Sequence, residues 1–173
     1  MFRPLAAMAL LGAGLVAACS PTFNWREVRV ESTSLTAMMP CKPDTAAREV
    51  PMAGRQVRLT ALSCEAGGAT FAVLFADVGD PARLGEALAQ WKAATLANLR
   101  SAAAQETPFL PHGALALPQS LQVVASGQRA DGSTVESHAA YFAHGSHVFQ
   151  AVIYAGQLKP EQASSFFAGL GFP

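Results

Sequence analysis

The sequence predicts an α+β fold, in which an antiparallel sheet of about five to six strands packs against one long amphipathic helix and a short C-terminal helix. Two observations predict the sheet. Apolar and polar residues alternate in segments such as 56–62, and turn sequences such as Gly67-Gly68 separate consecutive apolar segments. A third observation predicts the long helix, because leucines and a tryptophan recur at helical spacing after residue 80.

Length and composition indicate a single folded domain once a targeting segment is removed. The chain has 173 residues, of which 51% are hydrophobic and 14% are charged, whereas disordered chains carry more charge and less apolar surface. Basic and acidic residues both number 12, so the formal net charge is zero. Because the sequence has no basic cluster, we expect no nucleic-acid partner.

Residues 1–18 are predicted to be a signal peptide. Arg3 supplies a positive charge, residues 5–15 form an apolar segment that is short for a membrane span of about 20 residues, and small residues follow. Val16-Ala17-Ala18-Cys19 resembles the bacterial lipobox, whose cysteine receives a diacylglycerol and becomes the first residue of the mature protein. Cleavage after Ala18 without lipidation and an uncleaved anchor are the alternatives.

Lipidation of Cys19 would make the membrane the first partner of this protein, because each buried methylene contributes about 0.8 kcal/mol. Ser20 follows Cys19 where aspartate would favour the inner membrane, so by analogy with lipoprotein sorting we expect an outer-membrane location facing the periplasm. Residues 19–33 are predicted to form the lipid anchor and a polar tether, and residues 34–173 a single α+β domain. Phe23 and Trp25 either dock on the domain or contact a partner.

Cysteine usage agrees with export. Of the three cysteines, lipidation of Cys19 leaves Cys41 and Cys64, which we expect to form a disulfide in an oxidising compartment. A closed loop of about 22 residues is worth roughly 3 kcal/mol in the chain-entropy account. Two buried free thiols are the alternative.

The first half of the domain contains a short strand, a hairpin and the long helix. Residues 35–39 form a short apolar segment that ends at Pro40, and residues 56–62 and 70–78 form strands on either side of Gly67-Gly68. Asp80-Pro81 opens the helix, with aspartate as the N-cap, and the helical pattern continues to about Ala104. Its apolar stripe is expected to cover the sheet and consists of Leu84, Leu88, Trp91, Leu96 and Leu99.

The second half contains a long connection, a three-stranded meander and the last helix. The connection, residues 105–119, carries four apolar residues that either cap the sheet edge or bind a partner: Phe109, Leu110, Leu115 and Leu117. Strands are expected at 121–129, 134–143 and 147–154, joined by Asp131-Gly132 as a type I′ turn and Gly145-Ser146 as a type II′ turn. A helix opening at 159–161 ends the chain.

The sequence has no catalytic motif and indicates no cofactor. If Gly145-Ser146 is a two-residue turn, His144 and His147 lie opposite each other with β-carbons about 5 Å apart. They are weak candidates for a metal site, because such a site needs further ligands that are absent nearby in sequence. Solvated turn histidines are the simpler interpretation.

The layout resembles a broad set of bacterial envelope proteins with a PsbP-like α/β sandwich. The residues that carry this resemblance are Pro40-Cys41-Lys42-Pro43 before the hairpin, Asp131-Gly132 in the meander, Tyr141-Phe142 in an aromatic strand and Ser164-Ser165-Phe166-Phe167 in the last helix. The segment from Ser20 to Val28 also resembles an uncharacterised group of proteobacterial lipoproteins. The resemblance implies a non-catalytic accessory subunit of a membrane complex, and it rests on the fold alone.

These observations favour a non-catalytic binding or accessory (scaffold) protein of the cell envelope, with an envelope protein as its partner. The alternative is a small-ligand carrier whose pocket lies between the long helix and the sheet. A fully packed interface at that place would argue against a carrier. An enzyme is the third hypothesis and would require convergent titratable groups in a cleft.

Overall fold

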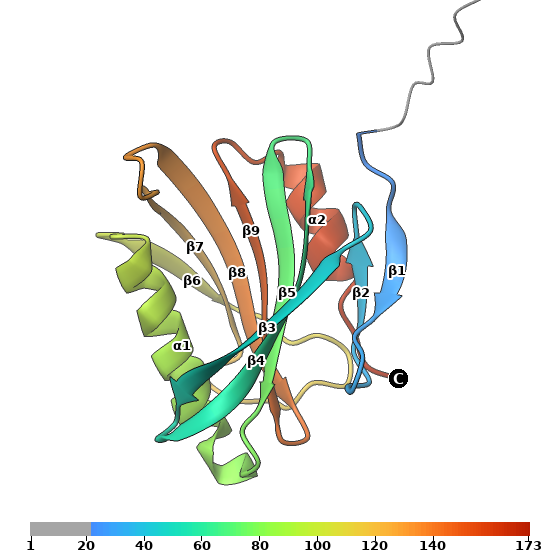
Figure 1. Cartoon of the computed structure of the whole chain (residues 1–173), viewed down its shortest axis with the longest axis vertical. Helices are drawn as coiled ribbons and strands as arrows, with labels where there is room; N and C mark the ends of the chain where they lie inside the picture. The colour runs from blue at the N-terminus through green and yellow to red at the C-terminus, as the bar shows by residue number, and fades with distance from the viewer. Residues whose placement is uncertain (1–21) are drawn as a thin grey trace, which may run out of the picture.

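The computed structural model describes residues 22–173 and confirms the α+β class (Figure 1). Its main element is an antiparallel sheet of seven strands in the order β3-β4-β5-β9-β8-β7-β6. These strands are β3 (Asp44–Met52), β4 (Arg55–Ala66), β5 (Ala69–Asp77), β6 (Ala104–Pro108), β7 (Leu121–Gln128), β8 (Thr134–His144) and β9 (His147–Ala155). The other elements are a two-stranded sheet of β1 (Arg26–Arg29) and β2 (Thr36–Met39), the 3₁₀ turn η1 (Pro81–Arg83), and the helices α1 (Leu84–Asn98) and α2 (Pro160–Ala168).

The sheet is larger than the five to six strands predicted, because the sequence does not predict either of its edge strands. In β3, residues 44–49 are all exposed. In β6, all five residues are exposed, and they occupy the range in which the sequence predicts a helix end and a long connection. An edge strand that buries few side chains lacks the period of two by which half-buried strands are detected.

The long helix begins where the sequence predicts. Asp80 Oδ1 accepts a hydrogen bond from the Ala82 N–H at 2.9 Å, ahead of η1, which continues directly into α1. Leu84, Leu88 and Trp91 are no more than 9% exposed. The predicted apolar stripe therefore covers the sheet.

The helix ends at Asn98, six residues before the predicted end near Ala104. Arg100 adopts a left-handed backbone conformation with φ 51°, and the Ser101 N–H donates to the Leu96 carbonyl at 3.1 Å. This is the Schellman ending, which glycine usually occupies at the left-handed position. With arginine there, the sequence carries no visible stop signal.

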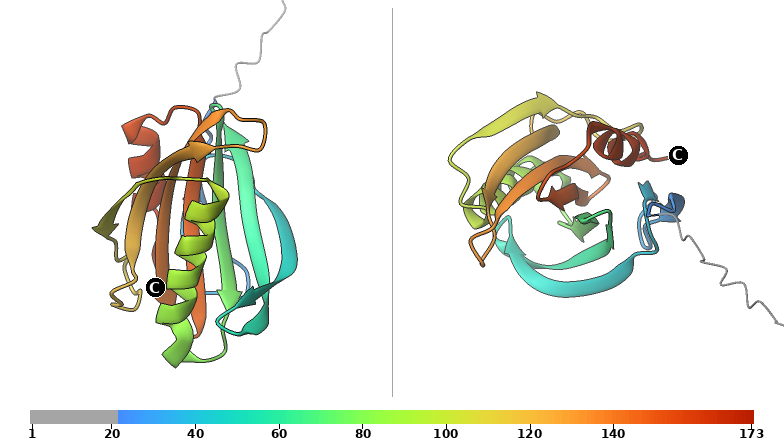
Figure 2. Two further views of the ribbon diagram at one scale, coloured as in Figure 1. Left: turned by 90° about the vertical axis from the view of Figure 1, so that its left-hand side faces the viewer. Right: turned by 90° about the horizontal axis from the view of Figure 1, so that it is seen from above.

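The two helices cover opposite faces of the curved sheet (Figure 2). We call the face that packs against α2 and the β1–β2 hairpin the α2 face, and the face that packs against α1 the α1 face. Strand residues alternate between them: in β9, Phe149 and Ile153 belong to the core of the α2 face, while Val148 and Val152 belong to that of the α1 face.

The α2 face holds all the phenylalanines that the structure describes. The chain has ten phenylalanines, of which Phe2 precedes residue 22, and the other nine lie in or against this core. Phe142 and Phe149 stack with ring centroids 5.2 Å apart, and Phe71 meets Phe166 edge-on at 5.5 Å. Aromatic pairs of this kind add about 0.5–1.5 kcal/mol beyond their buried area. These pairs therefore stabilise the core of the α2 face in addition to its hydrophobic burial.

The predicted tether over residues 19–33 is shorter than expected, because β1 lies within it. β1 pairs with β2 from Arg26↔Met39 to Arg29↔Thr36, and Val30 is 1% exposed. Phe23 and Trp25 pack against the α2-face core, which is the docking alternative stated above. Their burial depends on contacts with β5, a distant segment that a local pattern does not reveal.

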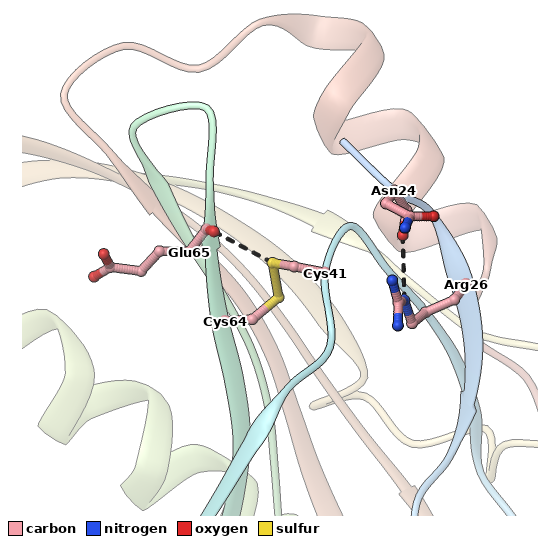
Figure 3. Close-up of a disulfide and its surroundings, with 5 residues drawn as sticks. All are labelled: Asn24, Arg26, Cys41, Cys64 and Glu65. Carbon is pink, nitrogen blue, oxygen red and sulfur yellow. Dashed lines mark hydrogen bonds between the residues drawn. A yellow bond between two sulfur atoms is a disulfide. The ribbon is translucent and has the colours of Figure 1, made fainter. Parts of the chain in front are cut away.

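Cys41 and Cys64 form the predicted disulfide (Figure 3). Cys41 follows β2, and Cys64 lies in β4 close to its turn with β5, so the bond ties the β1–β2 hairpin to the large sheet. The Cys41 Sγ also lies 3.4 Å from the Glu65 carbonyl oxygen. A disulfide sulfur carries no hydrogen, so we treat this as a van der Waals contact.

The turn between β7 and β8 differs from the predicted two-residue type I′ turn. Gln128 pairs with Thr134, so residues 129–133 form a five-residue loop. Only Gly132 has a positive φ, 84°, and Asp131 Oδ1 accepts the Ser133 N–H at 2.9 Å. The aspartate thus caps its own turn, and the larger loop projects Arg129 beyond the strands.

Neither helix of residues 22–173 has the length and hydrophobicity that a membrane crossing requires. The residues for which a signal peptide and lipidation at Cys19 are predicted lie outside the described part of the chain.

Candidate functional site

A cleft of about 880 Å³ lies between the C-terminal half of α1 and the sheet. We call it the α1 cleft. Its volume falls within the range of about 300–1,000 Å³ typical of small-molecule sites. Its apolar wall includes Leu59, Leu74, Trp91, Leu99 and Val135. Its polar and charged lining consists of Arg48, Glu65, Thr70, Thr95, Asn98, Gln128, Arg129, Gln150 and Tyr154.

The N-terminal half of α1 closes the same interface. Leu84, Ala87 and Leu88 are at most 1% exposed, and the Ala53 N–H donates to Gln90 Oε1 at 2.9 Å, which joins the helix to the β3–β4 turn. One turn further on, the helix lines the cleft. The cleft is therefore open at one end and closed at the other.

The two faces of the sheet differ in the size of their central side chains. On the α1 face, the central strands contribute Ala72, Ala76, Ala139 and Ala143, whereas the α2 face has phenylalanine at Phe71, Phe75, Phe142 and Phe149. Interiors pack to near-crystalline density when side-chain volume suffices. The four alanines lie outside the cleft lining, whose small residues are at the β4–β5 turn (Ala66, Gly67, Gly68 and Ala69) and in the β7–β8 loop (Ala130).

The floor of the cleft is a buried polar network centred on Gln150, which is 3% exposed. Its Nε2 donates to Thr95 Oγ1 at 3.0 Å and to Tyr141 Oη at 2.9 Å. The Thr95 hydroxyl donates in turn to the Trp91 carbonyl at 3.0 Å. A satisfied network of this kind fixes the orientation of its members.

The Gln150 amide oxygen faces the cleft. It accepts no hydrogen bond from residues 22–173, yet no side-chain nitrogen or oxygen in that range is both fully buried and without a partner. The oxygen therefore retains accessible surface, and because Gln150 lines the cleft, this surface opens into it. It is an acceptor available to a ligand's O–H or N–H group.

Charged residues stand at the rim of the cleft. Arg48 of β3 pairs with Leu59 of β4, which places it on the α1 face, and Arg129 lies in the β7–β8 loop. Both side chains are exposed. Figure 3 shows the Glu65 carboxylate directed away from the disulfide, toward the side of the sheet on which α1 lies.

The two tyrosines of this face stay protonated at neutral pH. Burial raises the pKa of Tyr141 to about 12, against the hydrogen bonds from Thr95 and Gln150, which lower it. Burial also raises the pKa of Tyr154, and a hydrogen bond with Ser137 opposes the shift. Two arginines and one glutamate, Arg48, Arg129 and Glu65, are the other titratable groups of the lining.

The four apolar residues predicted to form a partner-binding loop fall into a packed pair and an exposed pair. Phe109 packs against Phe142 and Phe167, and Leu117 packs against the core of the α1 face. Leu110 and Leu115 are 55% and 38% exposed. Two residues therefore cap the core and two remain available to a partner.

His144 and His147 lie opposite each other across the Gly145-Ser146 turn, as predicted. Each side chain has other contacts, however. His144 Nδ1 donates to the Gly113 carbonyl at 2.9 Å, and its ring stacks on Phe172 at 4.1 Å, while His147 lies against Phe75 and Phe149.

Asp77 pairs with His147 across β5 and β9, which sequence proximity does not reveal. A hydrogen bond with Ser146 is the main cause that lowers the pKa of this carboxyl. Within residues 22–173, no three histidine, cysteine, aspartate or glutamate side chains gather to hold a metal ion.

Comparison with known proteins does not assign the chain to a family. No family model matches it, and no curated protein matches it. The interpretation of the site therefore rests on the geometry of the α1 cleft.

Proposed function

We propose that this protein is a small-ligand carrier of the bacterial envelope, with the ligand held in the α1 cleft. The observation that supports this function is the cleft itself: about 880 Å³ of space, an apolar wall, a buried amide with a free acceptor, and charged residues at the rim. Convergent polar groups in an apolar concavity are the usual features of a ligand site.

We further propose that the carrier is a lipoprotein anchored through Cys19 to the outer membrane and facing the periplasm. The lipobox-like Val16-Ala17-Ala18-Cys19 supports this location, and the Cys41–Cys64 disulfide agrees with an oxidising compartment. Globomycin, which blocks lipoprotein signal-peptide cleavage, should cause accumulation of the uncleaved precursor. Unchanged processing in its presence would contradict the anchor.

Binding in the cleft is tested with Nile red, a neutral dye that fluoresces in apolar surroundings. The mature chain, residues 19–173 with Cys19→Ser and expressed without the predicted signal peptide, has no thiol for lipid attachment, so it can be purified without detergent that would compete for the cleft. We expect the dye to bind this protein. We expect Asn98→Trp, which places an indole in the cleft, to reduce dye binding at least about tenfold.

The matched control is Ala97→Trp, on the same exposed turn of α1 but outside the cleft lining. It should bind the dye as the parent does. Equal binding by both tryptophan variants would show that the dye sits elsewhere, and absence of binding in the parent would contradict the carrier function.

The second candidate function is that of an accessory protein, which the PsbP-like resemblance suggests. The observation that favours it is the exposure of Leu110 and Leu115. In pull-downs from solubilised membranes, a specific partner should be lost with Leu110→Ser and Leu115→Ser combined and retained with the neighbouring Ala116→Ser. Repeated recovery of no partner would contradict this function.

A further inference from the structure

The rim of the α1 cleft has an excess of positive charge. Its charged lining residues are Arg48, Arg129 and Glu65. Within residues 22–173, the ion pairs are Arg83–Glu86 and Lys92–Glu106 alone, so neither rim arginine is neutralised by a carboxylate in contact. An unpaired guanidinium presents donors in a planar fork that matches carboxylate and phosphate oxygens.

Apolar space begins next to Arg48. A second cavity of about 210 Å³ shares Arg48, Leu59 and Leu74 with the cleft and is otherwise lined by alanines. A third, of about 170 Å³, shares Arg48 and Trp91 with it. Arg48 therefore borders all three spaces, and the two smaller ones are lined mostly by aliphatic and aromatic side chains.

The charged donors and the uncharged acceptor of the cleft lie in different places. Donors that carry charge stand at the rim, where Arg48 and Arg129 are exposed, while the Gln150 oxygen, an uncharged acceptor, lies on the floor of the cleft. A ligand that matched this order would have an anionic end at the rim and an apolar body inside. An O–H or N–H group on that body could reach Gln150.

We propose that the ligand is an amphipathic organic anion, with its oxyanion at Arg48 and Arg129 and its apolar body against Leu59, Leu74 and Trp91. This inference rests on the proposed carrier function and specifies its ligand class. Its chemistry is that of a carboxylate or phosphate ester on an apolar body. A free amphiphile and a lipid headgroup are the two sources.

The test uses Trp91 as the reporter, because it lines the cleft while the other tryptophan, Trp25, packs on the opposite face. In the Cys19→Ser protein that also carries Trp25→Phe, Trp91 fluorescence is titrated with three probes of equal chain length: dodecanoate, dodecyltrimethylammonium and dodecyl maltoside, each below its micelle concentration. We expect dodecanoate to bind at least about tenfold more tightly than the cationic and neutral probes.

Substitutions of the two rim arginines test whether the anionic group of the ligand binds at the rim. Arg48→Gln and Arg129→Gln should each weaken dodecanoate binding about tenfold and leave dodecyl maltoside binding unchanged. The matched control is Arg58→Gln, an exposed arginine of β4 outside the cleft lining, which should not change either affinity. Circular dichroism checks that each variant is folded.

A further experiment distinguishes a free amphiphile from a lipid headgroup as the source of the anion. Binding to phosphatidylglycerol vesicles but not to free dodecanoate, lost with the rim variants, would support a lipid headgroup, and the reverse would support a free amphiphile. Equal affinity for the cationic probe, or equal loss with Arg58→Gln, would overturn the anion assignment. If Nile red still bound in a manner sensitive to Asn98→Trp, the carrier function would survive that failure.

Discussion

The two faces of the large sheet are formed by the same strands but use their inward residues differently. The α2 face gathers nine phenylalanines from the strands, from α2 and from flanking segments, and their rings fill the space between the layers. The α1 face places alanines and a glutamine network under a longer helix, and a cleft of about 880 Å³ remains. One face is fully packed and the other leaves a cleft, so substitutions on the two faces should affect stability and, under the proposed function, binding to different extents.

The largest effect is expected from Phe142→Ala on the α2 face. Phe142 is 0% exposed and stacks on Phe149, so its truncation should lower the free energy of unfolding by about 3–5 kcal/mol. Leu74→Ala in the half-buried cleft wall should cost about 1 kcal/mol, since water already reaches that site. Urea denaturation measures both, and equal costs would remove the distinction between the faces.

The next effect is expected from the disulfide, which ties the β1–β2 hairpin to the α2 face. Replacing Cys41 and Cys64 by serine should cost about 3 kcal/mol, because the unfolded chain regains the entropy of an open loop. Nile red binding in the cleft should persist under conditions where the variant is folded. Denaturation with and without a reductant gives the same comparison in the parent protein, and no change on reduction would count against it.

A smaller effect is expected from Gln150→Leu on the α1 face. The change removes the donor to Thr95 Oγ1 and Tyr141 Oη, and leaving buried polar groups unsatisfied should cost about 1–3 kcal/mol. Gln56→Leu, at an exposed position of β4, is the matched control and should change stability by less than about 0.5 kcal/mol. A neutral result for Gln150→Leu would mean that water entering the cleft replaces the amide.

The smallest effect is a pH dependence on the α2 face. The pKa of His138 is lowered, mainly by burial, while Glu136 opposes the shift. The unfolded state therefore binds a proton more readily, so stability is present above the unfolded pKa of about 6.5 and is lost as pH falls through the folded value. Urea midpoints at about pH 7.5 and about pH 5.5 should differ less in His138→Gln than in the parent. An unchanged difference would assign the pH dependence to other groups.

The sequence predicts the parts of this fold whose signals are local. The central strands β4, β5, β8 and β9 alternate or are continuously apolar, and Asp80 caps the helix as its position before Pro81 suggests. The edge strands lack a local signal because nearly all of their side chains are exposed. The end of α1 lacks one because arginine stands where glycine usually does.

The site was less predictable than the fold, because its members come from six strands, a helix and two turns. Arg48, Glu65, Arg129 and Gln150 have no common spacing, and only the strand register brings them to one cleft. The contrast between alanines and phenylalanines along the strands distinguishes the two faces, but it does not mark the cleft, because the alanines lie outside its lining. That contrast becomes interpretable only when the alternation is assigned to faces.

The contact between Phe23 and Gly67 has a consequence for the direction in which the cleft opens. A side chain at Gly67 would collide with the Phe23 ring, and Gly67 itself lines the cleft, so the described chain begins beside the mouth. Three residues separate Cys19 from Phe23, so the four steps between them span at most about 14 Å at about 3.5 Å per residue. A lipid on Cys19 would therefore hold the mouth close to the bilayer surface, and the molecule would take up or release its ligand at the membrane itself.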